Sequence, residues 1–177
     1  LNTLSMNDLL DCSFQSRPPL IDGLLYIGTY LLAGAPKIGK SFLVAQLAYH
    51  VSTGQAFLGY SVRQSGVLYL ALEDDYRRLQ NRMARMFGVE GTDNLNFAVA
   101  SAQIEAGLTE QLSNYLNDRP DTKLIIVDTL QKVREMVVES YSYSNDYETI
   151  GTLKSFAARH DICLLLVHHT RKQSAED

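Results

Sequence analysis

The stretch GAPKIGKS at residues 34–41 limits the possible folds of this chain more than any other feature. It matches the pattern G-x-x-x-x-G-K-[ST] and lies between an apolar run typical of a strand and an apolar-periodic stretch typical of a helix. Glycines let the backbone curl around an anion, and the amides at the start of the helix point at it. The order strand, loop, helix therefore predicts a nucleotide-binding loop. The residues expected to contact the nucleotide are Gly34, Ala35, Pro36, Lys37, Ile38, Gly39, Lys40, Ser41 and Phe42.

Three polar side chains of this loop have separate expected roles. Lys40 would reach the β- and γ-phosphates, and the Ser41 hydroxyl would be a ligand of Mg²⁺. ATP and Mg²⁺ are thus the expected cofactors. Two interpretations of Lys37 stay open: added charge near the γ-phosphate, or a solvated loop lysine. The second is favoured, because most lysines on protein surfaces are simply solvated.

The apolar runs predict a mainly parallel sheet covered by helices. They are nearly continuous rather than alternating, as in strands buried on both faces, and helical periodicity fills the stretches between them. We therefore expect an α/β fold, a three-layer sandwich built from right-handed βαβ units. The expected strands are 29–34, 67–72, 95–100, 124–127 and 162–167, and the expected helical faces are 43–51, 79–87, 108–116 and 150–157.

Two segments lack a clear period, residues 1–28 and 131–146. The first is expected to wrap the edge of the core. The second lies at the carboxyl end of the sheet, where open α/β sheets bind ligands. The expected organisation is an N-terminal extension, 1–20, and one main domain, 21–177. The first residue is not Met and the last stretch is polar, so we expect the sequence to be a fragment with an incomplete C-terminal part.

Composition excludes several classes of protein. The apolar runs are too short to cross a bilayer, and the start of the chain does not resemble a secretory signal, so a cytoplasmic protein without a membrane partner is expected. Only Cys12 and Cys163 are present, which predicts no disulfide framework. The net charge of −4 argues against a surface coated in basic residues, although it allows a local basic loop.

Carboxylates follow two of the predicted strands. Asp128 comes directly after 124–127 and is the expected second Mg²⁺ ligand beside a phosphate loop. Many P-loop ATPases place a catalytic Glu immediately after this Asp, but here Thr129 occupies that position. Glu73, at the end of another strand, is therefore the expected catalytic carboxylate. Asp74 and Asp75 are expected to cap the next helix. Its arginines, Arg77, Arg78 and Arg82, are expected to form a solvated face.

The last predicted strand ends in VHHTRK. His168 and His169 are adjacent, so they point to opposite faces and cannot readily bind one metal ion together. The spacing of His160 and Cys163 is also poor for zinc. Either a structural hydrogen bond or contact with the γ-phosphate would suit a polar residue at this strand end, and neither is favoured by the residues alone.

With GAPKIGKS, LYLALEDD, LIIVDT and VHHTRK in this order, the chain resembles the RecA-like ATPases over about residues 20–177. Within them it is most similar to the RepA-like plasmid and phage replication helicases, relatives of the DnaB replicative helicases. The resemblance implies a RecA-like P-loop core and carries over residue by residue. Lys40 and Ser41 match the phosphate-loop lysine and the metal-binding hydroxyl, and Asp128 the second metal carboxylate. Glu73 matches the catalytic glutamate. His169 matches a Gln or His that contacts the γ-phosphate.

The resemblance also implies partners. Relatives assemble as homo-oligomeric, hexameric rings, and two loops line the ring channel and contact single-stranded DNA. The stretch YSNDYE at 143–148 looks like a Tyr-x-x-Asp-Tyr motif of RepA-like proteins, with no role that we can assign. Relatives further supply an arginine finger from a neighbouring subunit, on a segment beyond the sequence, so weak ATPase activity is expected of this chain alone. The residues at the DNA-binding positions are Lys132, Arg134, Arg171 and Lys172.

Three functions fit these features. The favoured one is a Mg²⁺-dependent, helicase-type ATPase acting in DNA replication of a mobile element. The second is an ATP-dependent regulatory protein that does not translocate, which the acidic net charge favours. The third is a P-loop kinase, which is disfavoured because the Arg77, Arg78 and Arg82 group lies on a packed helix and makes a poor mobile lid.

Overall fold

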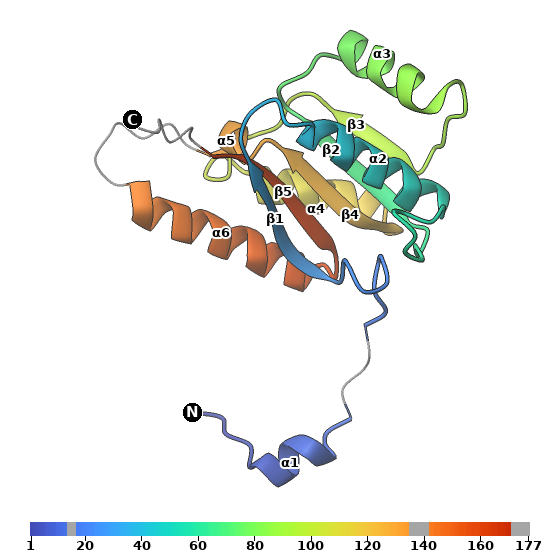
Figure 1. Cartoon of the computed structure of the whole chain (residues 1–177). Coiled ribbons are helices and arrows are strands. Elements are labelled where there is room, and N and C mark those ends of the chain that lie inside the picture. Colours follow the sequence, from blue (N-terminus) through green and yellow to red (C-terminus); the bar gives the residue numbers. More distant parts are fainter. Residues whose placement is uncertain (14–16, 135–141, 171–177) are drawn as a thin grey trace, which may run out of the picture.

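The protein contains a five-stranded sheet in which all paired strands are parallel (Figure 1). The computed structural model describes residues 1–13, 17–134 and 142–170, without the side chains of 142–148. The strand order is β1-β5-β4-β2-β3. This order confirms the predicted α/β class and the five predicted strands. Their bounds are β1 Gly28–Gly34, β2 Gly66–Ala71, β3 Leu95–Ala98, β4 Thr122–Asp128 and β5 Cys163–His169.

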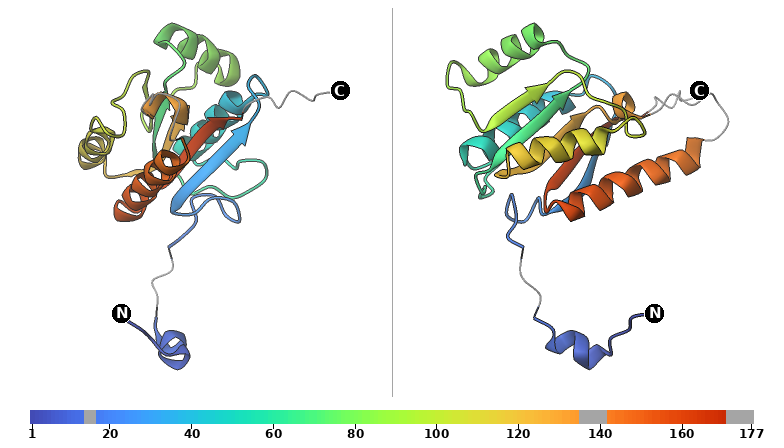
Figure 2. Two further views of the ribbon diagram at one scale, coloured as in Figure 1. Left: turned by 90° about the vertical axis from the view of Figure 1, so that its left-hand side faces the viewer. Right: turned by 180° about the vertical axis from the view of Figure 1, so that it is seen from behind.

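Helices cover both faces of the sheet, which confirms the three-layer sandwich (Figure 2). Alternate residues of one strand enter different apolar cores: Val67 packs with α2 and α3, whereas Leu68 packs with α4, α5 and α6. Because both faces are covered, the central strands are apolar throughout, as in β4 from Leu124 to Val127. The helix bounds are α2 Lys40–Thr53, α3 Tyr76–Phe87, α4 Leu108–Asp118, α5 Leu130–Val133 and α6 Ser142–Arg159.

The N-terminal segment divides into two parts. Leu20, Ile21 and Leu25 are buried in the core on the α2 side, and Ile21 forms bridges with Leu25 and Val62. This part wraps the edge of the core as expected. Helix α1 (Met6–Asp11) was not predicted; it lies apart from the sheet (Figure 1), and none of its described residues is buried. Hydrogen bonds between Ser5 and Asp8 form a capping box that holds this short helix by local contacts.

The segment after β4 begins at the carboxyl end of the sheet, as predicted. It forms α5 at once, and α6 starts at Ser142. The YSNDYE stretch lies in α6, and its side chains are outside the described part of the chain. Among the described residues, no helix is both long enough and apolar enough to cross a bilayer.

Candidate nucleotide-binding site

The phosphate loop joins the end of β1 to the start of α2. Gly39 is the residue before the helix and has a φ of +94°, a conformation that only glycine adopts without strain. Gly34 is needed for a different reason. A Cβ at this position would lie 2.7 Å from Cδ1 of Ile38, so the loop can fold back over it only if no side chain is present. The two glycines of the motif therefore allow a tight loop that no other residue pair would form.

Lys40 is buried inside this loop, with 6% of its surface exposed. Its ammonium donates hydrogen bonds to the carbonyl oxygens of Gly34 (2.8 Å) and Ala35 (2.7 Å). The positive charge therefore lies where the loop backbone curls, in the position expected of a group that meets bound phosphate. Lys37 is exposed at the outside of the loop.

Asp128 ends β4 and is 5% exposed. Its Oδ2 accepts a 2.8 Å hydrogen bond from the Tyr69 hydroxyl, and its Oδ1 has no hydrogen-bond partner among the described residues. Burial, followed by the charge of Asp128, raises the pKa of the Tyr69 phenol, so this hydroxyl stays protonated and can donate. Tyr69 was not identified in the sequence, where it is one apolar-strand residue among several.

A pocket of about 600 Å³ opens beside these groups, lined among others by Ser41, Phe42, Glu73, Arg82 and Asp128. Hard cations such as Mg²⁺ prefer oxygen ligands, and they keep several waters or substrate phosphates alongside one or two protein groups. A hydroxyl and a buried carboxylate oxygen without a partner, facing one pocket, fit this requirement. The residues present therefore fit Mg²⁺ held jointly with a nucleotide.

Glu73 lies just beyond β2, next to the end of β4. The Thr129 hydroxyl donates a 3.2 Å hydrogen bond to its Oε1, and Nε2 of His169 lies 3.8 Å from its Oε2. The carboxylate is half exposed. The structure thus brings Glu73 and His169 together, and Thr129, which follows the metal carboxylate in sequence, contacts the glutamate of the neighbouring strand.

His169 is the last residue of β5 and lies beside the phosphate loop. It is paired with Gly34 in the β1–β5 register, and the next amide, that of Thr170, donates to the Gly34 carbonyl (3.1 Å). Neither ring nitrogen of His169 has a hydrogen-bond partner among the described residues. The Gly34 carbonyl thus contacts both the end of β5 and the Lys40 ammonium.

Gln131 connects the end of β5 to α5. Its Nε2 contacts Nδ1 of His168 (3.0 Å) and donates to the carbonyl oxygen of His169 (3.1 Å). Burial, then the nearby charge of Arg134, lowers the pKa of His168, which favours a neutral ring that accepts from Gln131. Sequence reasoning missed Gln131, since an exposed glutamine on a short helix carries no pattern.

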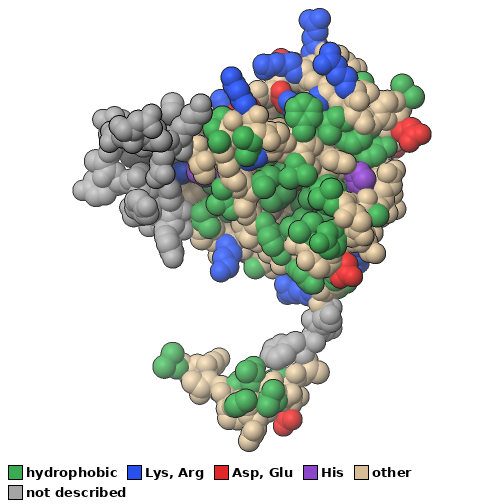
Figure 3. Space-filling view, in the orientation of Figure 1, with side chains coloured by type: hydrophobic (Ala, Val, Ile, Leu, Met, Phe, Trp, Pro, Cys, Tyr) green, Lys and Arg blue, Asp and Glu red, His purple; other side chains and the backbone are tan. Residues whose placement is uncertain are grey.

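Two expectations for the start of α3 need correction. Asp75 caps the helix as predicted, accepting from the Arg78 amide at 2.8 Å. Asp74 does not cap it: it pairs with Arg82 at 2.7 Å, and the guanidinium also lies 5.4 Å from the Phe42 ring centroid. Arg82 is 18% exposed and so is not part of a solvated face. The reason is that α3 folds back over the start of α2. Lys and Arg side chains nevertheless gather over α3 (Figure 3).

The residues at the DNA-binding positions divide between described and undescribed parts of the chain. Lys132 is exposed on α5, and Arg134 follows it, half-buried. Arg171 and Lys172 lie outside the described residues.

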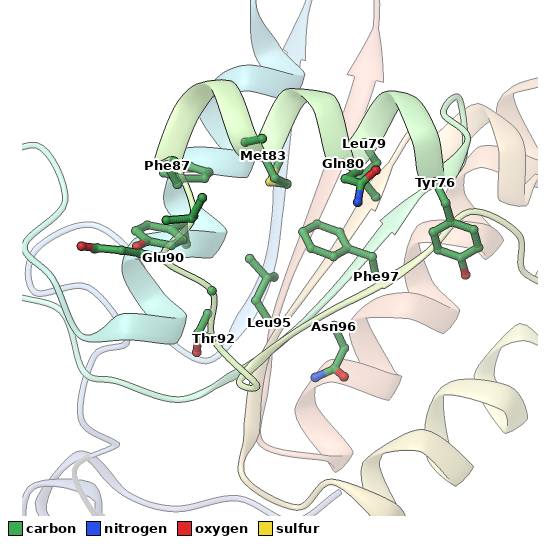
Figure 4. A pocket seen from close by; sticks show the side chains of 15 residues that line it. Tyr76, Leu79, Gln80, Met83, Phe87, Glu90, Thr92, Leu95, Asn96 and Phe97 are labelled. Atoms are coloured by element: carbon green, nitrogen blue, oxygen red, sulfur yellow. The ribbon is translucent and has the colours of Figure 1, made fainter.

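A second pocket, of about 700 Å³, is apolar and lies between α3 and β3 (Figure 4). Leu79, Met83 and Phe87 line it from the helix, and Leu95 and Phe97 from the strand. No described residue of the predicted site lines this pocket. It is therefore separate from the phosphate loop.

Comparison with known proteins was made against this geometry. A family model described as "AAA domain" matches residues 1–175. The chain belongs to this AAA-domain family. It is 24% identical over 159 residues to the DNA repair protein RadA of Helicobacter pylori, an alignment that covers 86% of this chain and 31% of RadA.

Among solved structures, this AAA-domain protein is similar to the ATPase domain of a helicase. The TM-score is 0.60 at 14% identity, covering 83% of this chain and 58% of that one. The likeness shows the fold. Together these matches confirm the resemblance found in the sequence: the chain is a RecA-like P-loop ATPase domain related to the DnaB-like helicases. It spans less than two thirds of the length of each of these two relatives.

Proposed function

We propose that this AAA-domain protein is a Mg²⁺-dependent ATPase that acts as a RepA-like replicative helicase or replication protein of a plasmid, phage or other mobile element. One observation carries the proposal: Lys40, Asp128 and Glu73 meet at one end of the sheet, beside the phosphate loop. A binding loop alone would serve a nucleotide sensor. A carboxylate placed beside the metal position adds what hydrolysis requires.

Each residue has a defined part in this scheme. The loop amides and the Lys40 ammonium would bind the phosphates, while Ser41 and Asp128 would hold Mg²⁺. The bound ion supplies positive charge that offsets the charge developing on the phosphates. Glu73, held on one side by the Thr129 hydroxyl at 3.2 Å, would orient the attacking water and accept its proton.

His169 would report the state of the γ-phosphate. Its ring lies near Glu73, and its backbone is paired with the first residue of the phosphate loop. Gln131 contacts the same strand end and belongs to α5, the helix that carries Lys132. A change at the γ-phosphate would therefore be transmitted to α5 through a short set of contacts.

The proposed partners are single-stranded DNA and further copies of the chain in a hexameric ring. The relative from Helicobacter pylori is named a DNA repair protein, which supports a role on DNA. Lys132 and Arg134 follow β4 at the end of the sheet that holds the site, and DNA contact there would be coupled to the nucleotide.

A regulatory ATPase that does not translocate is the second candidate. The net charge of −4 favours it, because a DNA motor needs positive charge along its path. A kinase is the third. It is less well supported, because Arg82 is held by Asp74 and Phe42 instead of standing on a mobile lid.

ATP hydrolysis with and without single-stranded DNA distinguishes these functions. A helicase-type motor predicts a rate stimulated by DNA, with the stimulated rate lost in Lys40→Ala. An unchanged rate and unchanged oligomeric state with DNA would favour the regulatory protein. Transfer of labelled phosphate to a small molecule would favour the kinase.

A further inference from the structure

Tyr69 is a completely buried polar side chain beside the proposed metal position. It lies in β2, with 0% of its surface exposed. Its hydroxyl oxygen lies 2.8 Å from Oδ2 of Asp128 and 3.5 Å from the carbonyl oxygen of Ser41. A single phenol thus contacts both residues that we assign to Mg²⁺.

The sheet register explains how a residue in the middle of β2 reaches the end of β4. Ala71 is paired with Asp128, and Tyr69 is paired with Ile126, two positions earlier. Side chains two positions apart lie on the same face of a strand, so Tyr69 and Asp128 share the face covered by α2. The tyrosine side chain is long enough to span this distance and place its hydroxyl at the carboxylate.

The two oxygens of Asp128 have different environments. Oδ2 accepts from Tyr69, whereas Oδ1 has no hydrogen-bond partner among the described residues. A buried carboxylate oxygen without a donor is unfavourable unless a cation or a cation-bound water meets it. The tyrosine thus fixes one oxygen and leaves the other for the metal.

We propose that Tyr69 is a positioning residue for metal binding: its hydroxyl holds the Asp128 carboxylate so that Oδ1 faces Mg²⁺ bound with ATP. This inference rests on the proposed function, in which Asp128 binds the metal. Hydrogen bonds between a side chain and an ionised group are stronger and shorter than neutral ones. The short contact goes to the carboxylate although a backbone carbonyl lies within 3.5 Å, so the phenol is used for Asp128.

The test compares Tyr69→Phe with a matched control, Tyr49→Phe. Both changes remove one hydroxyl and keep the ring. Tyr49 is also buried, but it lies on α2 with its ring stacked on Phe87, and it lines the apolar pocket. ATP affinity is measured for each protein in excess Mg²⁺ and in EDTA, and the ratio of the two affinities is the gain that Mg²⁺ provides.

The wild type is expected to bind ATP more tightly with Mg²⁺. In Tyr69→Phe this gain should fall about tenfold, which equals about 1.4 kcal/mol, while the affinity in EDTA stays the same. Tyr49→Phe should keep the full gain. A tyrosine needed only for packing would change both affinities together, so an unchanged ratio in Tyr69→Phe would overturn the inference.

Two further readouts keep the outcome decisive. A variant that is folded but destabilised is compared by the shift in melting temperature that ATP causes with and without Mg²⁺, since a ligand stabilises any folded protein that it binds. Asp128→Asn in the same assay shows whether the carboxylate binds the metal. If the wild type and Asp128→Asn gain equally from Mg²⁺, the metal assignment is wrong and the inference falls with it. If only Asp128→Asn loses the gain, the assignment stands and the role of Tyr69 is refuted.

Discussion

The Thr129 hydroxyl donates a hydrogen bond to the Glu73 carboxylate across the ends of two neighbouring strands, at 3.2 Å. Thr129 directly follows Asp128, at the position where many P-loop ATPases carry their catalytic glutamate. The contact places the carboxylate of Glu73 close to that position from the adjacent strand. Glu73 and Asp128 thereby lie in one pocket with Ser41. This arrangement is the basis of the catalytic role that we propose for Glu73.

Lys40→Ala is expected to weaken ATP binding by about tenfold to a hundredfold, the effect of losing a hydrogen-bonded charge. Lys37→Ala should change the affinity by about twofold or less if Lys37 is a solvated loop residue. Titration of each protein with a fluorescent ATP analogue measures both values. Equal losses in the two variants would show that Lys37 also contacts the phosphates.

Asp74→Ala is expected to lower the free energy of unfolding by about 1–3 kcal/mol, because it removes the hydrogen-bonded partner of a guanidinium that is 18% exposed. Arg78→Ala is the control. Its pair with Asp75 is 3.9 Å long and more than half exposed, so a change of at most about 0.5 kcal/mol is expected. Urea unfolding measures both. Similar losses would mean that the Asp74–Arg82 pair contributes no more than a surface pair.

Cys163 gives a prediction for alkaline pH. Burial raises the pKa of its thiol from 9.0 to about 12. Between these values the unfolded chain loses this proton and the folded protein keeps it, so the stabilising contribution is complete below pH 9 and is lost as the pH rises towards 12. The free energy of unfolding should fall by up to about 1.4 kcal/mol per pH unit from this thiol. Cys163→Ala should show a shallower fall, and identical slopes would contradict the prediction.

Lys132→Glu is expected to weaken binding of single-stranded DNA and to make its salt dependence shallower by about 0.7 per lost phosphate contact. Lys154→Glu reverses the charge of an exposed lysine on α6 and serves as the control. Fluorescence anisotropy over a range of salt concentrations gives affinity and slope. DNA binding that is unaffected by Lys132→Glu would exclude α5 from the interface. Charge reversal at Arg134 and Arg171 tests the remaining loop positions in the same way.

The sheet could be predicted from the sequence because both its faces are covered. The run at 124–127 lies inside β4, and its carboxyl end correctly placed Asp128 at the edge of the sheet. The same reasoning brought Glu73 and His169 to that edge. Parallel strands end at a common edge, so the position of a residue in one strand indicates its neighbours in others.

Contacts between distant residues could not be predicted in this way. Tyr69 and Asp128 are 59 positions apart, and their hydrogen bond depends on the β2–β4 register. The pair of Asp74 and Arg82 depends on how α3 packs over α2. Helix α1 was missed for another reason: it has six residues, is held by a local cap, and shows no face that packs on the core.

The most direct test of the proposed mechanism is the rate of ATP hydrolysis by Glu73→Gln, measured together with its affinity for ATP. Asp75→Asn is the matched control, since asparagine caps a helix as well as aspartate. We predict that Glu73→Gln binds ATP like the wild type and hydrolyses it about 10²–10⁴ times more slowly, the usual contribution of general base catalysis. Hydrolysis at the wild-type rate by Glu73→Gln would contradict the assignment of Glu73 as the group that activates water.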